Sequence, residues 1–505
     1  MRIRKLSYLV PYLACLLALC SIQAKADVSL PNIFGDHMVF QQKQKNKVWG
    51  KADPGEAVRV QFHESVQETE ADDDGMWSVM IDPAPAGGPY ELSVQGKNSI
   101  VIKDVLVGEV WICSGQSNME WRVNSTNDPD LVKVAANYPE IRMINYPNTG
   151  SQTPIFTHAN SNWMVCSPST VGDFSAVGYF FGRQLHQSLG VPIGLVNDAW
   201  GGSAADAWIN RDLLEADEQY KPTLDRWKAM EKQYDILAAK AEPSDNEKKQ
   251  MAGLRRQMGG NHRPSNIYNG VLKSHLGYGM KGVIWYQGES NAGRAYQYRH
   301  IFPMMIQNWR DEWGQGDFPF YWVQLADFRN EEAEPGESDW AELREAQTMT
   351  MKLPNTGEAV IIDVGEGKDI HPRNKVIVGQ RLARWALAKQ YGFEIAYQSP
   401  TYTGMKKAGK KLVLSFSHVD GGWRPFDVRE PVGFAIAGED KKFVWAKAKI
   451  VNNQTIEVWS DEVAEPVAVR YGWANNPVCN MFDTMGLPLT PFRTDDWPGV
   501  TVDRF

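Results

Sequence analysis

Cysteine is scarce in this sequence, with five residues among 505. Cys15 and Cys20 fall within the first 26 residues, which leaves Cys113, Cys166 and Cys479 in the rest of the chain. These three form no Cys-x-x-Cys pair and no spacing with histidine that is typical of a metal site. They exclude a disulfide framework, because at most one pair can form, and whether two of them pair stays open.

Positive charge is also in the minority. The chain has 53 Lys and Arg against 61 Asp and Glu, a formal net charge of −8, and its isoelectric point is about 5.7. Proteins that bind nucleic acid usually present a basic face and a high isoelectric point. The composition therefore argues against a nucleic-acid partner and against attraction to an anionic membrane surface.

Long apolar runs are absent except near the start of the chain. A basic stretch (MRIRK) precedes the run LSYLVPYLACLLALC, and Ala24-Lys25-Ala26 follows it. This order is typical of a cleavable secretory signal, and the run is shorter than the roughly 20 residues that span a bilayer. We therefore expect residues 1–26 to be removed, the mature protein to be secreted or periplasmic, and no insertion into the membrane after cleavage.

The remaining chain changes its pattern twice. Residues 27–103 alternate short apolar runs with turn residues, which predicts an N-terminal β-sandwich. Residues 104–395 contain continuous apolar runs (VLVGEVWIC, VPIGLVND, GVIWYQ, FPFYWVQL, AVIIDV) between helical stretches, the pattern of an α/β domain with a mostly parallel sheet. A charged helical insertion is expected at about 210–263. Strand-like runs return at 396–505, which predicts a C-terminal β-rich module.

Ser117 is the strongest candidate for a reactive residue. It lies in Ser114-Gly115-Gln116-Ser117-Asn118, directly after the run VGEVWIC, where a strand is expected to end and a helix to begin. Open α/β sheets bind their ligands at such positions, and helix N–H groups there can stabilise an oxyanion. The Gly-x-Ser-x-Gly elbow of α/β-hydrolases is not matched, because Met119 occupies its second glycine position. A helix-capping serine would satisfy the same spacing.

A nucleophilic serine needs a base, and one of the nine histidines has suitable neighbours. His371 follows the last predicted sheet strand, with Asp369 two residues before it. A loop at the carboxyl end of a strand can face the serine loop across the sheet, and the carboxylate can orient the imidazole ring. The pattern thus favours a Ser117–His371–Asp369 arrangement.

Two further loops follow predicted strands of the same domain. Trp200-Gly201-Gly202-Ser203 comes after VPIGLVND, and Gln287-Gly288-Glu289-Ser290-Asn291 comes after GVIWY. Glycine lets the backbone aim an N–H group at a ligand, and Gln or Asn adds a neutral side-chain donor. Together these loops predict an oxyanion hole, although each alone would also fit an ordinary glycine turn.

Six segments in order carry a resemblance: LPNIFGDHMVFQQ, VWICSGQSNMEW, NDAWGGSAADAWI, GVIWYQGESNA, ELREAQ and DIHPRNK. From about residue 29 to its end, the chain resembles the bacterial sialate O-acetylesterase family of the SGNH (GDSL-like) hydrolase superfamily. The resemblance implies a three-layer, flavodoxin-like α/β domain. It also implies that Ser117 is the nucleophile, His371 the base and Asp369 its orienting acid. The implied oxyanion hole comprises the Ser117 and Gly202 N–H groups with a side chain from Gln287 or Asn291.

The sequence departs from the superfamily at two places. The acid and base usually occur as Asp-x-x-His, whereas one residue separates Asp369 from His371 here. Asp363, Glu366 or a backbone carbonyl therefore remain alternatives for orienting the ring. The third block usually carries its asparagine as Gly-x-Asn-Asp, which QGESNA does not match uniquely, so Gln287 and Asn291 both remain candidates.

The resulting prediction is an O-acetylesterase that works through an acetyl-enzyme on Ser117 and requires no metal or organic cofactor. The expected substrate is an O-acetylated glycan or sialic acid, with acetylated xylan as the alternative. Tryptophans beside the motifs could stack on sugar rings or fill the core: Trp111, Trp121, Trp200, Trp208 and Trp285. Two other functions are considered, a non-catalytic glycan-binding protein and a glycosidase that uses Glu289. The sequence does not determine the oligomeric state.

Overall fold

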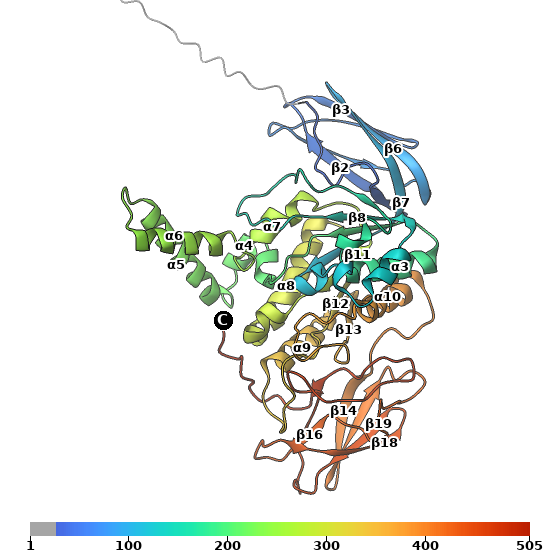
Figure 1. Ribbon diagram of the computed structural model, residues 1–505, viewed down its shortest axis with the longest axis vertical. Coiled ribbons are helices and arrows are strands. Elements are labelled where there is room, and N and C mark those ends of the chain that lie inside the picture. Colours follow the sequence, from blue (N-terminus) through green and yellow to red (C-terminus); the bar gives the residue numbers. More distant parts are fainter. Residues whose placement is uncertain (1–26) are drawn as a thin grey trace, which may run out of the picture.

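The computed structural model describes residues 27–505, so the predicted signal segment lies outside the described residues. Figure 1 shows an elongated molecule in which a β-rich region, a central α/β body and a second β-rich region follow one another along the long axis. A pair of helices projects sideways from the central body. This arrangement confirms the predicted mixed α/β fold with additional β-rich regions.

The N-terminal β-rich region alternates buried and exposed side chains along its strands, and β3 is the clearest case, with every second residue buried. β2 pairs with β5, while β3 pairs with β4 and β6. The strands are β1 (Val39–Gln41), β2 (Asn46–Lys51), β3 (Ala57–Phe62), β4 (Ser65–Glu70), β5 (Met76–Ile81) and β6 (Gly87–Gln95).

One long strand, β7 (Ser99–Gly115), connects this region to the central body. Its first part pairs antiparallel with β6, and residues 106–108 pair parallel with β1. Its second part forms the middle of the central sheet, between β10 and β11. The boundary expected after residue 103 falls inside this strand.

The central sheet has the order β13-β12-β11-β7-β10-β8-β9, and all of its pairs are parallel except β8 with β9. Every residue of β10, β11 and β12 is buried, in agreement with the continuous apolar runs. The remaining strands are β8 (Tyr138–Asn145), β9 (Met164–Cys166), β10 (Ile193–Asn197), β11 (Gly282–Tyr286), β12 (Phe320–Val323) and β13 (Thr356–Ala359). The run AVIIDV begins only at the last residue of β13, so most of it is buried loop.

Helices pack on the sheet and leave its carboxyl ends to the loops. α3 and α10 pack against each other and contribute to one hydrophobic core, whereas α8 and α9 contribute to another. Gly190, in a left-handed conformation, ends α3 as expected. The helices of the body are α1 (Ser117–Glu120), α2 (Pro129–Val134), α3 (Ala176–Leu189), α7 (Asn266–Gly270), α8 (Ala295–Trp313), α9 (Asp339–Met349) and α10 (Lys375–Tyr391). Short 3₁₀ helices are η1 (Val123–Ser125), η2 (Val171–Asp173), η3 (Ala205–Trp208), η4 (Leu272–Ser274), η5 (Glu289–Arg294) and η6 (Thr350–Lys352).

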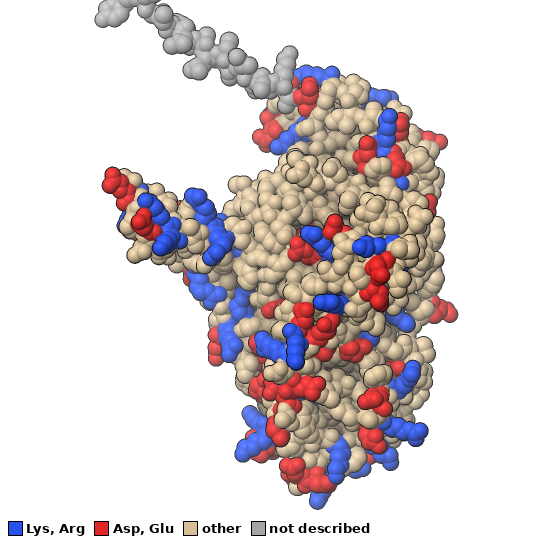
Figure 2. Space-filling model, viewed as in Figure 1, with Lys and Arg blue, Asp and Glu red and all other residues tan. Residues whose placement is uncertain are grey.

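The segment expected to be a helical insertion contains α4 (Arg211–Glu215), α5 (Lys221–Ala238) and α6 (Asp245–Met258). α5 and α6 form a helical hairpin, here called the arm, which projects from the body in Figure 1. A capping box of Ser244 and Glu247 starts α6. Figure 2 shows both signs of charge interspersed on the arm, as expected for a solvated helical surface.

The C-terminal β-rich region consists of two four-stranded sheets that enclose a third hydrophobic core. Buried Arg344 of α9 ties this region to the body, because its guanidinium donates to the carbonyl oxygens of Ala326 and Ala474. The strands are β14 (Thr401–Ala408), β15 (Lys411–Ser417), β16 (Phe434–Ala437), β17 (Val444–Trp445), β18 (Lys447–Asn452), β19 (Thr455–Trp459), β20 (Ala468–Tyr471) and β21 (Phe492–Arg493).

Three properties raised by the sequence can be stated for residues 27–505. Cys113, Cys166 and Cys479 are free thiols. In this part of the chain, no helix has the length and apolar character needed to cross a membrane. It also contains no group of three or more His, Cys, Asp or Glu side chains arranged to hold a metal ion.

Candidate active site

Ser117 lies at the turn between β7 and α1, at the carboxyl end of the middle strand of the sheet. Gly115 permits this turn: its φ is +130°, and a Cβ there would lie 2.3 Å from the Tyr286 carbonyl oxygen. The sheet order reverses at β7, since β10 lies on one side and β11 on the other. Such a reversal opens a crevice for ligands, so the fold places Ser117 where an α/β sheet binds substrate.

His371 lies across this crevice, in the loop before α10, and its Nε2 is 2.9 Å from Ser117 Oγ. Its ring stacks on Trp121, with 4.9 Å between centroids and 13° between planes. Burial lowers the pKa of His371 below its ordinary value, although the Asp369 charge opposes this effect. The imidazole is therefore neutral at pH 7 and able to accept the Ser117 proton.

Asp369 lies beside the same histidine but does not form a short hydrogen bond with its ring. Its Oδ1 is 3.6 Å from His371 Nδ1 and accepts a hydrogen bond from the His371 backbone N–H at 2.9 Å. The alternative acids are engaged elsewhere, because Asp363 forms a two-pronged ion pair with Arg381 and Glu366 accepts from the Arg373 N–H. Among the described residues, Asp369 is thus the carboxylate that contacts the His371 ring.

The loops after β10 and β11 bring the predicted oxyanion residues to the neighbouring strand ends. Gly202 has a φ of +72°, and neither its N–H nor that of Ser117 has an acceptor among the described residues. The Gln287 amide donates to the Ser203 carbonyl and to Asn291 Oδ1. The Asn291 Nδ2, by contrast, is buried without an acceptor in the described part of the chain. Of the two side-chain candidates, Asn291 therefore retains an unoccupied donor.

A buried polar network behind the serine was not predicted from the sequence. Lys375, at the start of α10, donates to Asn118 Oδ1 at 2.5 Å, and Asn118 Nδ2 donates to Glu289 Oε1 and to the Ile370 carbonyl. Asn118 thereby connects the loops that follow β7 and β11 to the loop that carries His371. Burial lowers the pKa of Lys375 to about 7 and raises that of Glu289. Asn118 and Lys375 lie in the segments VWICSGQSNMEW and DIHPRNK, which carry the family resemblance. Their place in those segments is the one indication in the sequence that they belong to the site.

The tryptophans beside the motifs have different roles. Trp111, Trp208 and Trp285 are fully buried and fill the core, so they do not present a surface to a sugar. Trp121 is half-buried and stacks on the catalytic candidate His371. Trp200 is half-buried and packs against the core. These tryptophans thus fill the core or position His371.

Comparison with known proteins defines the reaction class: the protein is a carboxylic-ester hydrolase. The chain belongs to the family of carbohydrate esterases described as sialic acid-specific acetylesterases, whose model matches residues 107–241 and 261–388. A solved carbohydrate acetylesterase from Xanthomonas citri is 39% identical, with a TM-score of 0.81, and the match covers 93% of this chain and 100% of that one.

Mammalian relatives cover nearly the same length. Sialate O-acetylesterase of Mus musculus is 29% identical over 505 residues, 90% of this chain and 92% of the mouse protein. Sialate O-acetylesterase of Homo sapiens is 28% identical over 520 residues, 92% of each chain. The similarity therefore includes both β-rich regions as well as the central body.

Proposed function

We propose that this protein is an O-acetylesterase that removes acetyl groups from the hydroxyls of sialic acid. The observation that carries the proposal is the 2.9 Å contact between His371 Nε2 and Ser117 Oγ at the switch point of the sheet. The family assignment supports the substrate, as do the sialate O-acetylesterases that resemble the chain. The three-layer SGNH arrangement is the finer fold that we propose for the central domain.

Hydrolysis would proceed through a covalent acetyl-enzyme. His371 takes the proton of Ser117 as Oγ attacks the acetyl carbonyl, and Asp369 stabilises the resulting imidazolium. The N–H groups of Ser117 and Gly202 and the amide of Asn291 hold the oxyanion. His371 then gives this proton to the departing sugar oxygen, which leaves as a hydroxyl. Water attacks the acetyl-enzyme with the same histidine as base, and His371 returns the proton to Ser117 Oγ as acetate is released. The chain's own residues supply each of these steps.

The loops that carry the Gly202 N–H and the His371 ring are both fixed beside Ser117. The Gly201 N–H donates to Glu120 Oε2 at 2.6 Å, which fixes the first loop and leaves the adjacent Gly202 N–H without an acceptor among the described residues. Asn118 holds the second loop through the Ile370 carbonyl at 3.0 Å. Preorganised donors of this kind need no rearrangement as charge develops on the substrate oxygen.

The test is acetate release by purified wild-type protein and Ser117→Ala from an aryl acetate, an O-acetylated sialic acid and acetylated xylan. Wild type should release acetate from the aryl ester and prefer the sialic acid ester over xylan, whereas Ser117→Ala should be inactive on all three. A fluorophosphonate probe should label Ser117 in wild type. Full activity of Ser117→Ala would refute the nucleophile. Absence of labelling together with tight glycan binding would favour a non-catalytic glycan-binding protein.

We also propose that residues 1–26 direct export, so that the enzyme acts outside the cytoplasm. The order of basic, apolar and small residues supports this proposal. The proposed modules are residues 27–103, 104–395 and 396–505, with β7 shared across the first boundary. Cell fractionation and N-terminal sequencing of the mature protein would test the location, and an intact Met1 on the cytoplasmic protein would refute it.

A further inference from the structure

A cavity of about 440 Å³ lies at the base of the arm, and its lining includes none of the catalytic candidates. This volume is in the range of sites that bind small molecules. Its walls come from α5, from the last turn of α6 and from the loop that returns to the body. The lining residues are Trp227, Met230, Arg256, Gln257, Gly260, Asn261 and His262.

One wall of the cavity contacts the loop that carries Gly202. Asn261 Nδ2 donates to the Gly201 carbonyl at 2.5 Å, and the Asn261 carbonyl accepts from the Ala204 N–H at 3.2 Å. Gly201 in turn packs on the serine, because a Cβ placed on it would lie 3.5 Å from Ser117 Cβ. The cavity wall formed by Asn261 therefore contacts the residue, Gly201, that packs on Ser117.

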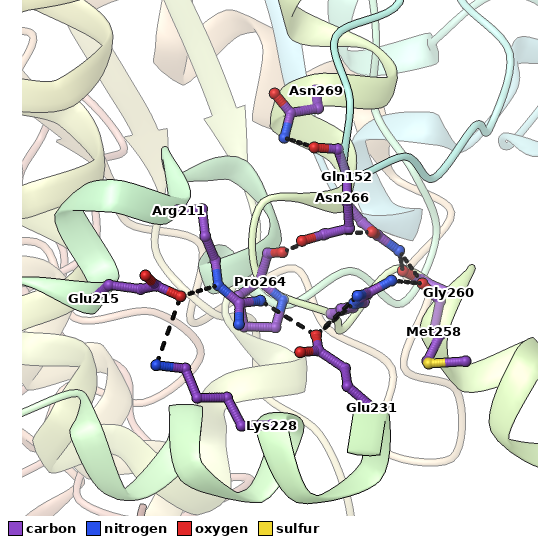
Figure 3. Close-up of polar contacts among 11 residues, drawn as sticks. Gln152, Arg211, Glu215, Lys228, Glu231, Met258, Gly260, Pro264, Asn266 and Asn269 are labelled. Carbon is purple, nitrogen blue, oxygen red and sulfur yellow. Dashed lines mark hydrogen bonds and ion pairs between the residues drawn. The ribbon is translucent and has the colours of Figure 1, made fainter. Parts of the chain in front are cut away.

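The base of the arm is held by polar contacts, which Figure 3 shows. Glu231 of α5 accepts from Arg263 at 2.8 Å and lies 3.5 Å from Arg211 of α4. Asn266 Nδ2 donates to the carbonyl oxygens of Met258 and Gly260, at the end of α6. These bonds fix the return loop, so the cavity is preformed.

The lining has the chemistry of a site for an acidic sugar. Trp227 is half-buried, lines the cavity and makes no contact with another aromatic ring in the described chain. An indole in such a position can stack on a sugar ring. Arg256 has no ion pair or hydrogen bond among the described residues, and His262 lines the same cavity. The lining contains no Asp or Glu, although acidic residues outnumber basic ones in the chain as a whole.

The cationic wall also lies where this chain departs from its family. The family model matches up to residue 241 and resumes at residue 261. Arg256, Gln257 and Gly260 fall in the unmatched stretch, whereas Trp227 and Asn261 lie in matched segments. The Arg256 side of the cavity is therefore formed by residues that the family model does not match.

We propose that the cavity is the subsite for the sugar whose hydroxyl is released, and that it selects sugars bearing a carboxylate. Trp227 stacks on the ring, and Arg256 pairs with the carboxylate in a charge-assisted hydrogen bond. The arm is then a specificity element of the esterase. This inference rests on the proposed function, because it assumes that a sugar ester reacts at Ser117.

The experiment compares kcat/KM on an O-acetylated sialic acid, an acetylated neutral xylo-oligosaccharide and 4-nitrophenyl acetate. Arg256→Gln should lower the preference for the acidic over the neutral sugar about tenfold, as expected for loss of one charge-assisted contact. Trp227→Ala should lower kcat/KM on both sugars about tenfold relative to the aryl ester. Trp227→Phe, which keeps an aromatic face, should restore most of that loss and guards against misfolding of the alanine variant.

Arg255→Gln is the matched control. Arg255 also lies in the last turn of α6, so its removal alters the helix end equally, but its guanidinium bonds to the Tyr234 hydroxyl outside the cavity. Arg255→Gln should keep the wild-type preference. If Arg256→Gln and Arg255→Gln had the same preference for the acidic over the neutral sugar, the assignment of Arg256 to the carboxylate would be overturned. An unchanged kcat/KM on both sugars in Trp227→Ala would overturn the subsite.

Free sialic acid tests the subsite without turnover of a sugar ester. It should inhibit wild-type hydrolysis of 4-nitrophenyl acetate competitively, with an inhibition constant about tenfold higher in Arg256→Gln and unchanged in Arg255→Gln. If the wild type releases no acetate from any sugar ester, the proposed function fails, and this inhibition still decides whether the cavity binds an acidic sugar. Absence of inhibition would refute the cavity as a sialic acid site.

Discussion

Replacing Asp369 by asparagine should lower kcat/KM on an aryl acetate by about fivefold. The Asp369 Oδ1 and His371 Nδ1 atoms are 3.6 Å apart, and the side chains retain 43% and 29% of their exposure. At that distance an ion pair in a water-like dielectric is worth about 1 kcal/mol, and solvent exposure allows no larger value. A barrier change of about 1 kcal/mol corresponds to about fivefold in rate.

This expectation differs sharply from that for a buried acid. A buried triad carboxylate that holds the histidine tautomer through a short hydrogen bond contributes about 10⁴ in kcat. Asp369 instead bonds to the His371 backbone N–H and lies beside the ring. The amide oxygen of an asparagine at this position can still accept from that N–H, so the substitution removes the charge and preserves the loop.

The pH profile gives a second measurement on the same variant. The Asp369 charge raises the pKa of His371 against the lowering effect of burial. Its removal should lower this pKa further, so the acidic limb of kcat/KM should move to lower pH, because the base must be neutral to act. Stopped-flow or plate assays of aryl acetate hydrolysis across the acidic and neutral pH range would measure both effects.

Glu366→Gln is the control, since Glu366 is the alternative acid and its amide can still accept from the Arg373 N–H. It should keep kcat/KM within about threefold of wild type, the scale of an exposed charge that does not contact the ring. A loss of about 10⁴ in Asp369→Asn, the size expected of a buried triad acid, would refute the assignment of Asp369 as a weak electrostatic partner. A shift of the acidic limb of kcat/KM to higher pH in Asp369→Asn would also refute this assignment.

Three further predictions concern buried polar groups. Lys375→Met removes a charge that lowers the pKa of His371. The acidic limb of the kcat/KM profile should therefore move to higher pH, opposite to its shift in Asp369→Asn. A shift to lower pH would refute the electrostatic coupling between Lys375 and His371. Asn291→Ala should lower kcat by about 10²–10³ with little change in KM, and an unchanged kcat would exclude Asn291 from the oxyanion hole. Burial raises the pKa of Glu358 from 4.5 to about 7, so the free energy of unfolding should fall by about 3 kcal/mol as pH rises from 4.5 through 7. Glu358→Gln should lack that decline in urea titrations on either side of this range, and an equal decline would contradict the shift.

Ser117, His371 and Asp369 could be located from the sequence because each follows a recognisable buried strand. Parallel strands end at the same edge of a sheet, so loops after β7 and β13 meet even though 254 residues separate Ser117 from His371. The orientation of side chains within those loops could not be predicted in the same way. Gln287 and Asn291 looked equivalent in sequence, and only their hydrogen bonds distinguish them.

Lys375 shows why the buried network escaped prediction. A lysine at the start of a charged helix is normally solvated, and neither spacing nor composition shows that tertiary packing covers it. The run AVIIDV makes a related point about strands. The apolar residues of this run are buried, as predicted. Only Ala359 pairs with β12, however, so β13 ends at the first residue of the run. Burial is readable from composition, whereas backbone pairing depends on the neighbouring strand.

The continuity of β7 has a consequence for attempts to recombine these modules. Its seventeen residues run from the pairing partner of β6 to the residue two before Ser117, with one irregularity at Asp104, where φ is +54° and the register with β6 shifts. If the chain were divided after residue 103, the remainder of β7 would lose its antiparallel partner β6. Apolar side chains that are buried between the first module and β7 would then be exposed. Exchange of the N-terminal module among related esterases should therefore succeed when the splice falls before Ser99, in the turn that precedes the strand. Amide hydrogen exchange should likewise report protection on both sides of Asp104, because the first part of β7 pairs with β6 and the second part with β10 and β11.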